Sequence, residues 1–330
     1  MPDTVTSVTS VLAPLTIRGV QLPNRVVMSP MSQKKALPDG RATDWHLVHY
    51  GCRAVGGVGL IMIEDCAVQG NGRTDPGALC LDGDRQVESL RRIVGFCHEQ
   101  GAKVGIQLGH AGRKAATLEP VGPSPLPFGP ASRPPRELAS EEVTKIPRQF
   151  AAAAIRAIDA GVDVVELHAS HGYLLHEFLS PLSNRRTDRY GGSPEARRCL
   201  LLETVQAMRE ACPATIPLFV RIALSDGVLD GLELEEGLET CEQSRQVGVD
   251  GFVPTVGRIT ADVPRVDSIP EYTELVRRRT SAVTIMTGGI TSADDAGKVI
   301  TSGICDLVAL GRALLADPYW VRHLKRIEQT

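Results

Sequence analysis

Short apolar runs alternate with longer segments of helical spacing along the whole chain. Eight of these runs are rich in β-branched residues and almost continuously apolar, which is typical of strands buried on both faces of a parallel sheet. The predicted strands are Arg25–Met28, Gly59–Ile63, Lys103–Leu108, Asp163–Leu167, Leu218–Ile222, Gly251–Val256, Val283–Met286 and Leu307–Leu310. The helical spacing predicts helices at residues 45–55, 84–100, 141–160, 194–211, 234–247, 270–280, 292–302 and 313–326.

Eight strand–helix pairs in succession favour an α/β fold of the (β/α)8 barrel (TIM barrel) type, formed as one domain by residues 12–330. A doubly wound sheet would normally carry G-x-G-x-x-G after an early strand, and the turns after Met28 and Ile63 lack it. Two long loops follow the third and fourth strands, Glu119–Arg136 with seven prolines and Ser180–Gly192. Their position predicts that they cover the carboxyl-terminal mouth of the barrel.

Composition excludes several classes of function. The net charge is −3 and aromatic residues make up 4% of the chain, so neither a basic surface nor stacking platforms for nucleic acid are expected. No apolar run reaches the ~20 residues of a membrane-spanning helix. The start, MPDTVTSVTS, has no signal-peptide pattern, and we predict a flexible tail over residues 1–11. The eight cysteines lack metal-binding spacing, which suggests reduced thiols in a cytoplasmic protein.

Polar and glycine residues follow most of the predicted strands. Because active sites of such barrels lie at the carboxyl-terminal ends of the strands, these residues are candidates for one site. They are Ser29-Pro30-Met31-Ser32, Gln107, His110, His168, His171, Tyr173, Arg221, Gly288, Gly289, Gly311 and Arg312.

A phosphate site is predicted after the last two strands. Gly288-Gly289 and Gly311 allow backbone N–H groups to approach an anion closely, in the loops that often bind phosphate in these barrels. Arg312 adds a guanidinium that can form two parallel hydrogen bonds with a phosphate.

The fourth strand leads into His168-Ala169-Ser170-His171-Gly172-Tyr173. His168 and His171 can donate hydrogen bonds to a developing oxyanion, and Tyr173 can supply a proton. His176 is expected to belong to the following turn. We predict no metal here, because His-x-His after the first strand and H-E-x-x-H are both absent. None of the seven lysines occupies the inward end of a strand, which disfavours Schiff-base chemistry.

Long motifs along the chain match one enzyme family. They are NRVVMSPM (Asn24–Met31), RAVGGVGLIMIE (Arg53–Glu64), IQLGHAGRKA (Ile106–Ala115), ELHASHGYLLHEFLSPLSNRRTDRYGGS (Glu166–Ser193) and DLVALGRALLADPYW (Asp306–Trp320). With these motifs the chain resembles the Old Yellow Enzyme family of flavin-dependent ene-reductases, in particular the bacterial subgroup that includes the xenobiotic reductases. The resemblance implies a barrel that binds FMN and lacks the iron–sulfur cluster of larger members.

The resemblance also implies a role for each matching position. Gln107 would hydrogen-bond the pyrimidine edge of the flavin, and Arg221 would stabilise the anionic reduced ring. His168 and His171 would bind the carbonyl oxygen of the substrate, and Tyr173 would deliver the proton. The full set of positions that would contact FMN is Ser29, Pro30, Met31, Ser32, Gly57, Gln107, Arg221, Gly288, Gly289, Gly311 and Arg312.

The implied reaction is a ping-pong transfer from NADPH or NADH to a small activated alkene. Hydride would pass to flavin N5 and then to the β-carbon of an alkene that bears a carbonyl or nitro group, while Tyr173 protonates the α-carbon. Some relatives are biosynthetic desaturases or isomerases of cyclic enones or ring acids, and this alternative stays open, as does a barrel that binds a phosphorylated ligand without redox chemistry. Relatives also imply a homodimer or homotetramer.

Two positions near the first strand depart from the subgroup. Ser32 stands where a cysteine is common, and Lys34 where a tyrosine is common. We expect these changes to alter the substrate pocket while leaving the flavin site intact. Lys34 suggests an acid or a thioester as substrate, although it is equally compatible with a solvated loop.

Overall fold

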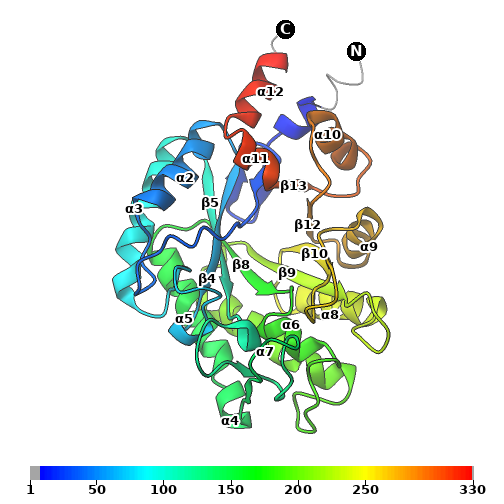
Figure 1. The fold of residues 1–330 in the computed structure, drawn as a ribbon. Helices are drawn as coiled ribbons and strands as arrows, with labels where there is room; N and C mark the ends of the chain where they lie inside the picture. The colour runs from blue at the N-terminus through cyan, green and yellow to red at the C-terminus, as the bar shows by residue number, and fades with distance from the viewer. Residues whose placement is uncertain (1–7, 329–330) are drawn as a thin grey trace.

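The computed structural model describes residues 8–328 and contains a closed barrel of eight parallel strands surrounded by helices (Figure 1). The barrel strands are β3 (Val26–Met28), β4 (Leu60–Ala67), β5 (Lys103–Gly109), β8 (Val164–Ala169), β9 (Leu218–Ser225), β10 (Gly251–Gly257), β12 (Val283–Thr287) and β13 (Leu307–Leu310). They pair in chain order, and β13 pairs with β3 to close the barrel. The predicted fold class and all eight predicted strands are confirmed.

Helices lie around the barrel between successive strands (Figure 1). They are α2 (Asp44–Val55), α3 (Val87–Glu99), α4 (Ser140–Val143), α5 (Ile146–Asp159), α6 (Leu174–Leu179), α7 (Pro194–Ala211), α8 (Leu234–Gln246), α9 (Pro270–Thr280), α10 (Ala293–Thr301), α11 (Arg312–Ala316) and α12 (Trp320–Glu328). Local signals fix several starts. Ser193 Oγ accepts from Ala196 N at 3.3 Å to cap α7, and Ser292 with Asp295 forms a capping box at α10.

The barrel is filled by apolar side chains from both its strands and a hairpin at one end. Short strands β1 (Leu15–Ile17) and β2 (Val20–Leu22) form this antiparallel hairpin, which contributes Leu22 to the same buried cluster as Leu60 and Phe219. Because Gly19 N donates to Thr215 O, just before β9, the hairpin lies against the amino-terminal end of the barrel. The hairpin therefore covers the amino-terminal end of the barrel, and the polar residues that follow the strands lie at the opposite, carboxyl-terminal rim.

The remaining short elements belong to loops that follow the strands. They are β6 (Val121–Gly122), β7 (Arg136–Glu137), β11 (Arg265–Val266), and the 3-10 turns Gly70–Gly72, Asp84–Gln86 and Gly112–Lys114. The proline-rich loop is joined to the loop after β10, since Ala261 N donates to Phe128 O at 3.0 Å. Among residues 8–328, no helix combines the length and apolar character needed to cross a bilayer.

The structure corrects several predicted boundaries. The helix expected over 313–326 is divided into α11 and α12, because Pro318 has no N–H to continue the ladder. The helix expected over 84–100 begins as a 3-10 turn, and the one expected over 141–160 is divided into α4 and α5. The tail expected through residue 11 is wrong for its last part: residues 8–12 are helical, and Val8 and Val11 are fully buried. Residues 1–7 lie outside the described part of the chain.

Candidate active site

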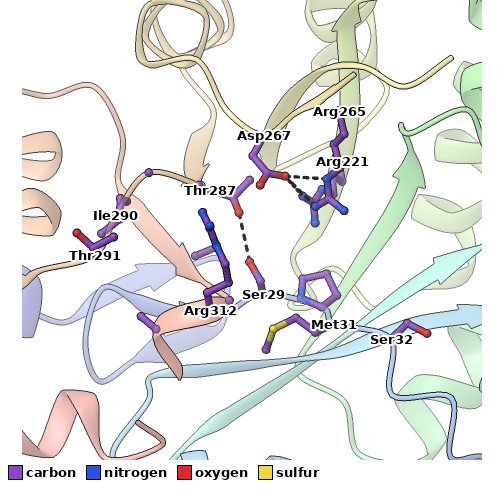
Figure 2. A pocket seen from close by; sticks show the side chains of 16 residues that line it. Ser29, Met31, Ser32, Arg221, Arg265, Asp267, Thr287, Ile290, Thr291 and Arg312 are labelled. Carbon is purple, nitrogen blue, oxygen red and sulfur yellow. Dashed lines mark hydrogen bonds and ion pairs between the residues drawn. The ribbon is translucent and has the colours of Figure 1, made fainter. Parts of the chain in front are cut away.

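A cavity of about 500 Å³ opens at the carboxyl-terminal rim over the ends of β3, β12 and β13 (Figure 2). It is lined by Ser29, Pro30, Met31, Ser32, Arg221, Arg265, Asp267, Thr287, Gly288, Gly289, Ile290, Thr291, Ala309, Gly311, Arg312 and Ala313. Ser29 Oγ lies 3.3 Å from Thr287 Oγ1, which joins the first strand end to the seventh. The residues predicted to bind a phosphate therefore share one cavity with the Ser29–Ser32 segment.

The loop after β12 has the backbone geometry of an anion site. Gly288 and Gly289 both have positive φ, 88° and 72°, which L side chains rarely adopt. A Cβ on Gly289 would meet nothing within 4 Å, so its backbone faces open space. In Figure 2 the Arg312 side chain extends into the cavity beside this loop. Among the described residues, no hydrogen-bond or ion-pair partner of Arg312 is found, so its guanidinium is free to bind a ligand.

Arg221 brings a buried positive charge to the same cavity. Its Nη2 lies 3.3 Å from Asp267 Oδ1, whereas its Nε has no hydrogen-bond partner among the described residues. Burial lowers the pKa of Arg221, and Arg265 acts in the same direction. A buried guanidinium with an unused donor is costly unless a ligand accepts from it.

A second cavity, of about 450 Å³, adjoins the first. The two share Pro30, Ser32, Arg221 and Arg265 as lining residues, so they form one continuous site. The other residues that line the second cavity are Asp65, Gln107, Lys114, His168, His171, Tyr173 and Arg258. Parallel strand register explains part of this convergence, because His168 on β8 pairs directly with Arg221 on β9.

His168 and His171 point toward one another. His168 Nε2 lies 3.0 Å from His171 Nδ1, and the other nitrogen of His168 lies 2.7 Å from Asp65 Oδ1. Burial lowers the pKa of both imidazoles, and for His168 the Asp65 carboxylate acts in the opposite direction. Asp65 fixes the orientation of the His168 ring, and the remaining ring nitrogen of the pair, His171 Nε2, is buried without a hydrogen-bond partner among the described residues.

Tyr173 completes this group at the start of α6. Its ring centroid lies 4.8 Å from that of His168. Burial raises the pKa of Tyr173 to about 12, so the phenol keeps its proton at neutral pH. The turn that carries it is tight: His171 and Gly172 have φ of 59° and 67°, and a Cβ on Gly172 would lie 2.5 Å from Arg258 O.

Gln107 occupies the floor of the second cavity. Its Nε2 donates to Glu166 Oε1 at 2.7 Å, across neighbouring positions of β5 and β8. Burial raises the pKa of Glu166 to about 7, although Arg221 acts in the opposite direction. His176 lies outside this site. It accepts from Gly172 N at 2.9 Å and contacts Asp226 at 3.0 Å, and it lies within α6, not in a turn as predicted.

Comparison with known proteins identifies the family. The sequence model of the NADH:flavin oxidoreductase / NADH oxidase family matches residues 10–330. The chain belongs to this family, that of the Old Yellow Enzymes. It is 42% identical over 317 residues to the NADPH dehydrogenase of Geobacillus sp. (strain WCH70), covering 94% of this chain and 92% of that protein. The NADPH dehydrogenase of Geobacillus thermodenitrificans (strain NG80-2) is 43% identical over 319 residues.

Solved structures agree with the barrel fold. Morphinone reductase matches with a TM-score of 0.84 and 26% identity, over 96% of this chain and 89% of its own. A 2-naphthoyl-CoA reductase in complex with 2-naphthoyl-CoA matches with a TM-score of 0.90 and 23% identity, over 97% of this chain and 52% of its own, which shows the fold alone. The chain is thus an FMN-dependent NAD(P)H oxidoreductase of the Old Yellow Enzyme type.

The site of this Old Yellow Enzyme fits FMN on two structural observations. The open backbone at Gly289 and the unpartnered Arg312 suit a phosphate, and the unused Nε of buried Arg221 suits a polar ring edge. These donors line one cavity that continues to the histidine pair. None of the described residues forms a group of three or more His, Cys, Asp or Glu suited to a metal ion.

The prediction for Gly57 is wrong. Gly57 lies in the turn before β4, at the amino-terminal rim, where its carbonyl accepts from Asn24 Nδ2 at 2.9 Å. A Cβ there would approach Val321 and Lys325 of α12. The rule that barrel sites follow the strands, rather than precede them, excludes this position from the flavin site.

Gly57→Ala is therefore expected to leave FMN affinity unchanged while lowering stability by about 1–2 kcal/mol, because φ is 89° at this position. Gly289→Ala is the matched variant, since it has a similar φ of 72° and open space for the added methyl. It should cost similar stability and also weaken FMN binding. FMN titration of the apoprotein and thermal unfolding measure the two effects. Weaker FMN binding by Gly57→Ala would instead support the prediction that Gly57 contacts the flavin.

Lys34 is not brought to the cavities. Its side chain is 63% exposed, and Nζ lies 3.1 Å from Asp75 Oδ2. Neither cavity has Lys34 among its lining residues, so the proposed contact with an acidic substrate has no structural support. The adjacent Ser32 does line both cavities.

Several lining residues were missed by the sequence analysis. Asp65 is inside β4 and could have been found from the strand-end rule, because it follows the apolar run that ends at Ile63. Lys114 lies in a 3-10 turn after β5, within a quoted motif but beyond the strand end itself. Arg258 directly follows β10, and Arg265 lies in β11, which pairs with β10. The sequence of this segment has no motif that would indicate a binding site.

Proposed function

We propose that this protein reduces carbon–carbon double bonds activated by a carbonyl or nitro group, with NADPH or NADH as the reductant. One observation carries the proposal: His168, His171 and Tyr173 line one cavity that continues into the flavin site, and the two imidazoles lie within hydrogen-bond distance of each other at 3.0 Å. The name NADPH dehydrogenase shared by the two Geobacillus relatives supports NADPH as one reductant.

FMN, when bound, supplies the hydride transfer between NAD(P)H and the alkene. We assign its ring to the segment Ser29-Pro30-Met31-Ser32. All four residues line the first cavity, and Pro30 and Ser32 also line the second. Gln107 and Arg221 supply hydrogen-bond donors to the polar edge of the ring. The phosphate is assigned to the group formed by Gly288, Gly289, Gly311 and Arg312.

His168 and His171 are assigned to the activating oxygen of the alkene. Imidazole N–H groups of this pair can donate to an oxygen at the point where negative charge develops, so the binding is strongest in the transition state. Asp65 orients His168 through the 2.7 Å contact at Nδ1. Both rings are buried, which strengthens their interaction with the developing charge.

Tyr173 is assigned as the proton donor to the α-carbon. Its pKa of about 12 keeps the phenol protonated, and Lys114 Nζ, 4.4 Å from its ring centre, stabilises negative charge there. Glu177 lies behind this turn and accepts from Arg113 N at 2.9 Å. Glu177 is not among the residues that line the second cavity, whereas Tyr173 is.

The proposal predicts two separable half-reactions. Purified protein should show a flavin absorbance spectrum that bleaches anaerobically on addition of NADPH. The reduced protein should regain its colour with 2-cyclohexenone or a nitroalkene and release the saturated product, while cyclohexanone should have no effect. Stopped-flow absorbance and product analysis measure both steps.

Three outcomes would contradict this function. A colourless protein that does not take up FMN would favour a binding protein for some other phosphorylated ligand. Bleaching by a saturated ring substrate without NADPH would instead indicate a desaturase. If oxygen reoxidised the reduced protein and no activated alkene did, the protein would be an oxidoreductase that does not reduce such alkenes.

A further inference from the structure

The second cavity is lined by more cationic side chains than the one, Arg221, that is assigned to the flavin. Lys114, Arg221, Arg258 and Arg265 all line it, against the single carboxylate of Asp65. Asp267, in the first cavity, contacts Arg221 at 3.3 Å and Arg265 at 2.7 Å, as Figure 2 shows. Within residues 8–328, neither Lys114 nor Arg258 forms an ion pair with a carboxylate.

These two cations are fixed beside the same aromatic ring. Lys114 Nζ lies 4.4 Å from the centre of the Phe128 ring, and Arg258 Cζ lies 5.5 Å from it. Phe128 belongs to the proline-rich loop and binds the segment after β10 through its backbone. The loop therefore packs its aromatic ring against both charges at the cavity.

Burial and mutual repulsion destabilise the positive charges of Lys114 and Arg258. Burial lowers the pKa of Lys114 to about 8, and Arg258 acts in the same direction. Two cations that oppose each other in a half-buried cavity are stabilised when a ligand brings a negative group between them.

The charges adjoin the site of the activating oxygen. Lys114 Nζ donates to the backbone oxygen of His171 at 2.8 Å and lies 4.4 Å from the Tyr173 ring centre. Arg258 is in contact with the same turn through its backbone, next to Gly172. An anion held here would thus be part of the molecule whose oxygen contacts the two histidines.

We infer that the natural alkene substrate is an anion, and that its carboxylate binds Arg258 together with Lys114 and Arg265 while its activating oxygen contacts His168 and His171. This inference rests on the proposed function and goes further by naming the substrate class. The phosphates of NADPH are also anions and could bind the same cations. The test therefore measures reduction by NADPH and reoxidation by the alkene separately.

The probe pair is 3-oxocyclohex-1-ene-1-carboxylate and its carboxamide, which has nearly the same shape and no charge. Reoxidation of photoreduced wild-type enzyme should favour the carboxylate by about tenfold or more at low salt, as expected for a charge-assisted contact. Arg258→Gln should remove most of this preference by slowing the reaction with the carboxylate far more than the reaction with the carboxamide. Arg258→Lys should restore part of it. Arg278→Gln, on the exposed face of α9, is the control and should behave as wild type.

The reductive half-reaction distinguishes the competing occupant. Wild type and Arg258→Gln are reduced with NADPH and with neutral 1-benzyl-1,4-dihydronicotinamide. If Arg258→Gln slows only reduction by NADPH and leaves the carboxylate preference intact, the cations bind the reductant and the inference is overturned. Equal rates of the wild type with carboxylate and carboxamide would also overturn it.

A binding measurement decides the inference even if no alkene is reduced. The oxidised holoenzyme is titrated with 3-oxocyclohexane-1-carboxylate and its carboxamide, and the flavin spectrum reports binding. Tighter binding of the carboxylate by wild type, lost in Arg258→Gln and weakened by added salt, supports an anion site whatever the reaction. Failure of 2-cyclohexenone to reoxidise the enzyme would count against the proposed function alone.

Discussion

Tyr173→Phe is expected to slow reoxidation of the reduced enzyme by an activated alkene by about 10²- to 10⁴-fold, the usual contribution of a positioned general acid. The phenol lines the substrate cavity beside His168, and its hydroxyl is the group lost in the variant. Reduction of the enzyme by NADPH should stay near the wild-type rate, because hydride transfer from the nicotinamide needs no proton from this position.

The pH profile adds a second check on Tyr173. An ordinary tyrosine loses its proton near pH ~10. Burial raises the pKa of Tyr173 to about 12, so the donor form is present below this value and is lost only as the pH rises through it. The Tyr173-dependent rate should therefore show no decline around the pKa of a free tyrosine.

Stopped-flow measurement of both half-reactions tests this prediction. Tyr319→Phe is the control, since Tyr319 is surface-exposed in the segment between α11 and α12. Equal loss in both half-reactions of Tyr173→Phe would indicate disturbed flavin binding instead of a lost proton donor. Unchanged alkene reduction would remove Tyr173 from the mechanism.

Arg312→Ala is expected to raise the dissociation constant of FMN by roughly 10- to 100-fold. A hydrogen bond to a charged group contributes about 1.5–3 kcal/mol, and about 1.4 kcal/mol corresponds to a tenfold change in affinity. The Arg312 side chain is exposed and forms no hydrogen bond or ion pair with the described residues, so its removal should not disturb the fold.

The readout is fluorescence titration of the apoprotein with FMN, compared with riboflavin. Arg312→Ala should weaken FMN binding and leave riboflavin binding unchanged, because riboflavin has no phosphate. Arg322→Ala, an exposed position on α12, is the matched control. An equal loss for both ligands would show that Arg312 contacts the ring or only supports the loop.

Two features of the site were within reach of sequence reasoning. Continuous apolar runs identified the barrel strands, and the residues that follow each run identified the rim that now carries the histidine pair and Arg312. Gly57 is the exception, because family resemblance implies a flavin contact at a position that precedes a strand. Its location next to α12 shows that the strand-end rule was the better guide.

Residue patterns along the chain were enough to predict the closed barrel and the rim on which the proposed phosphate-binding residues and the histidine pair lie. These follow from local patterns: burial of a parallel strand on both faces, and the fixed direction in which each strand ends. Three contacts became visible in the folded protein: Asp65 orients His168, Lys34 pairs with Asp75, and Lys114 and Arg258 lie beside Phe128. Long loops bring these side chains together through contacts between distant segments, and such contacts leave no periodic pattern in the chain.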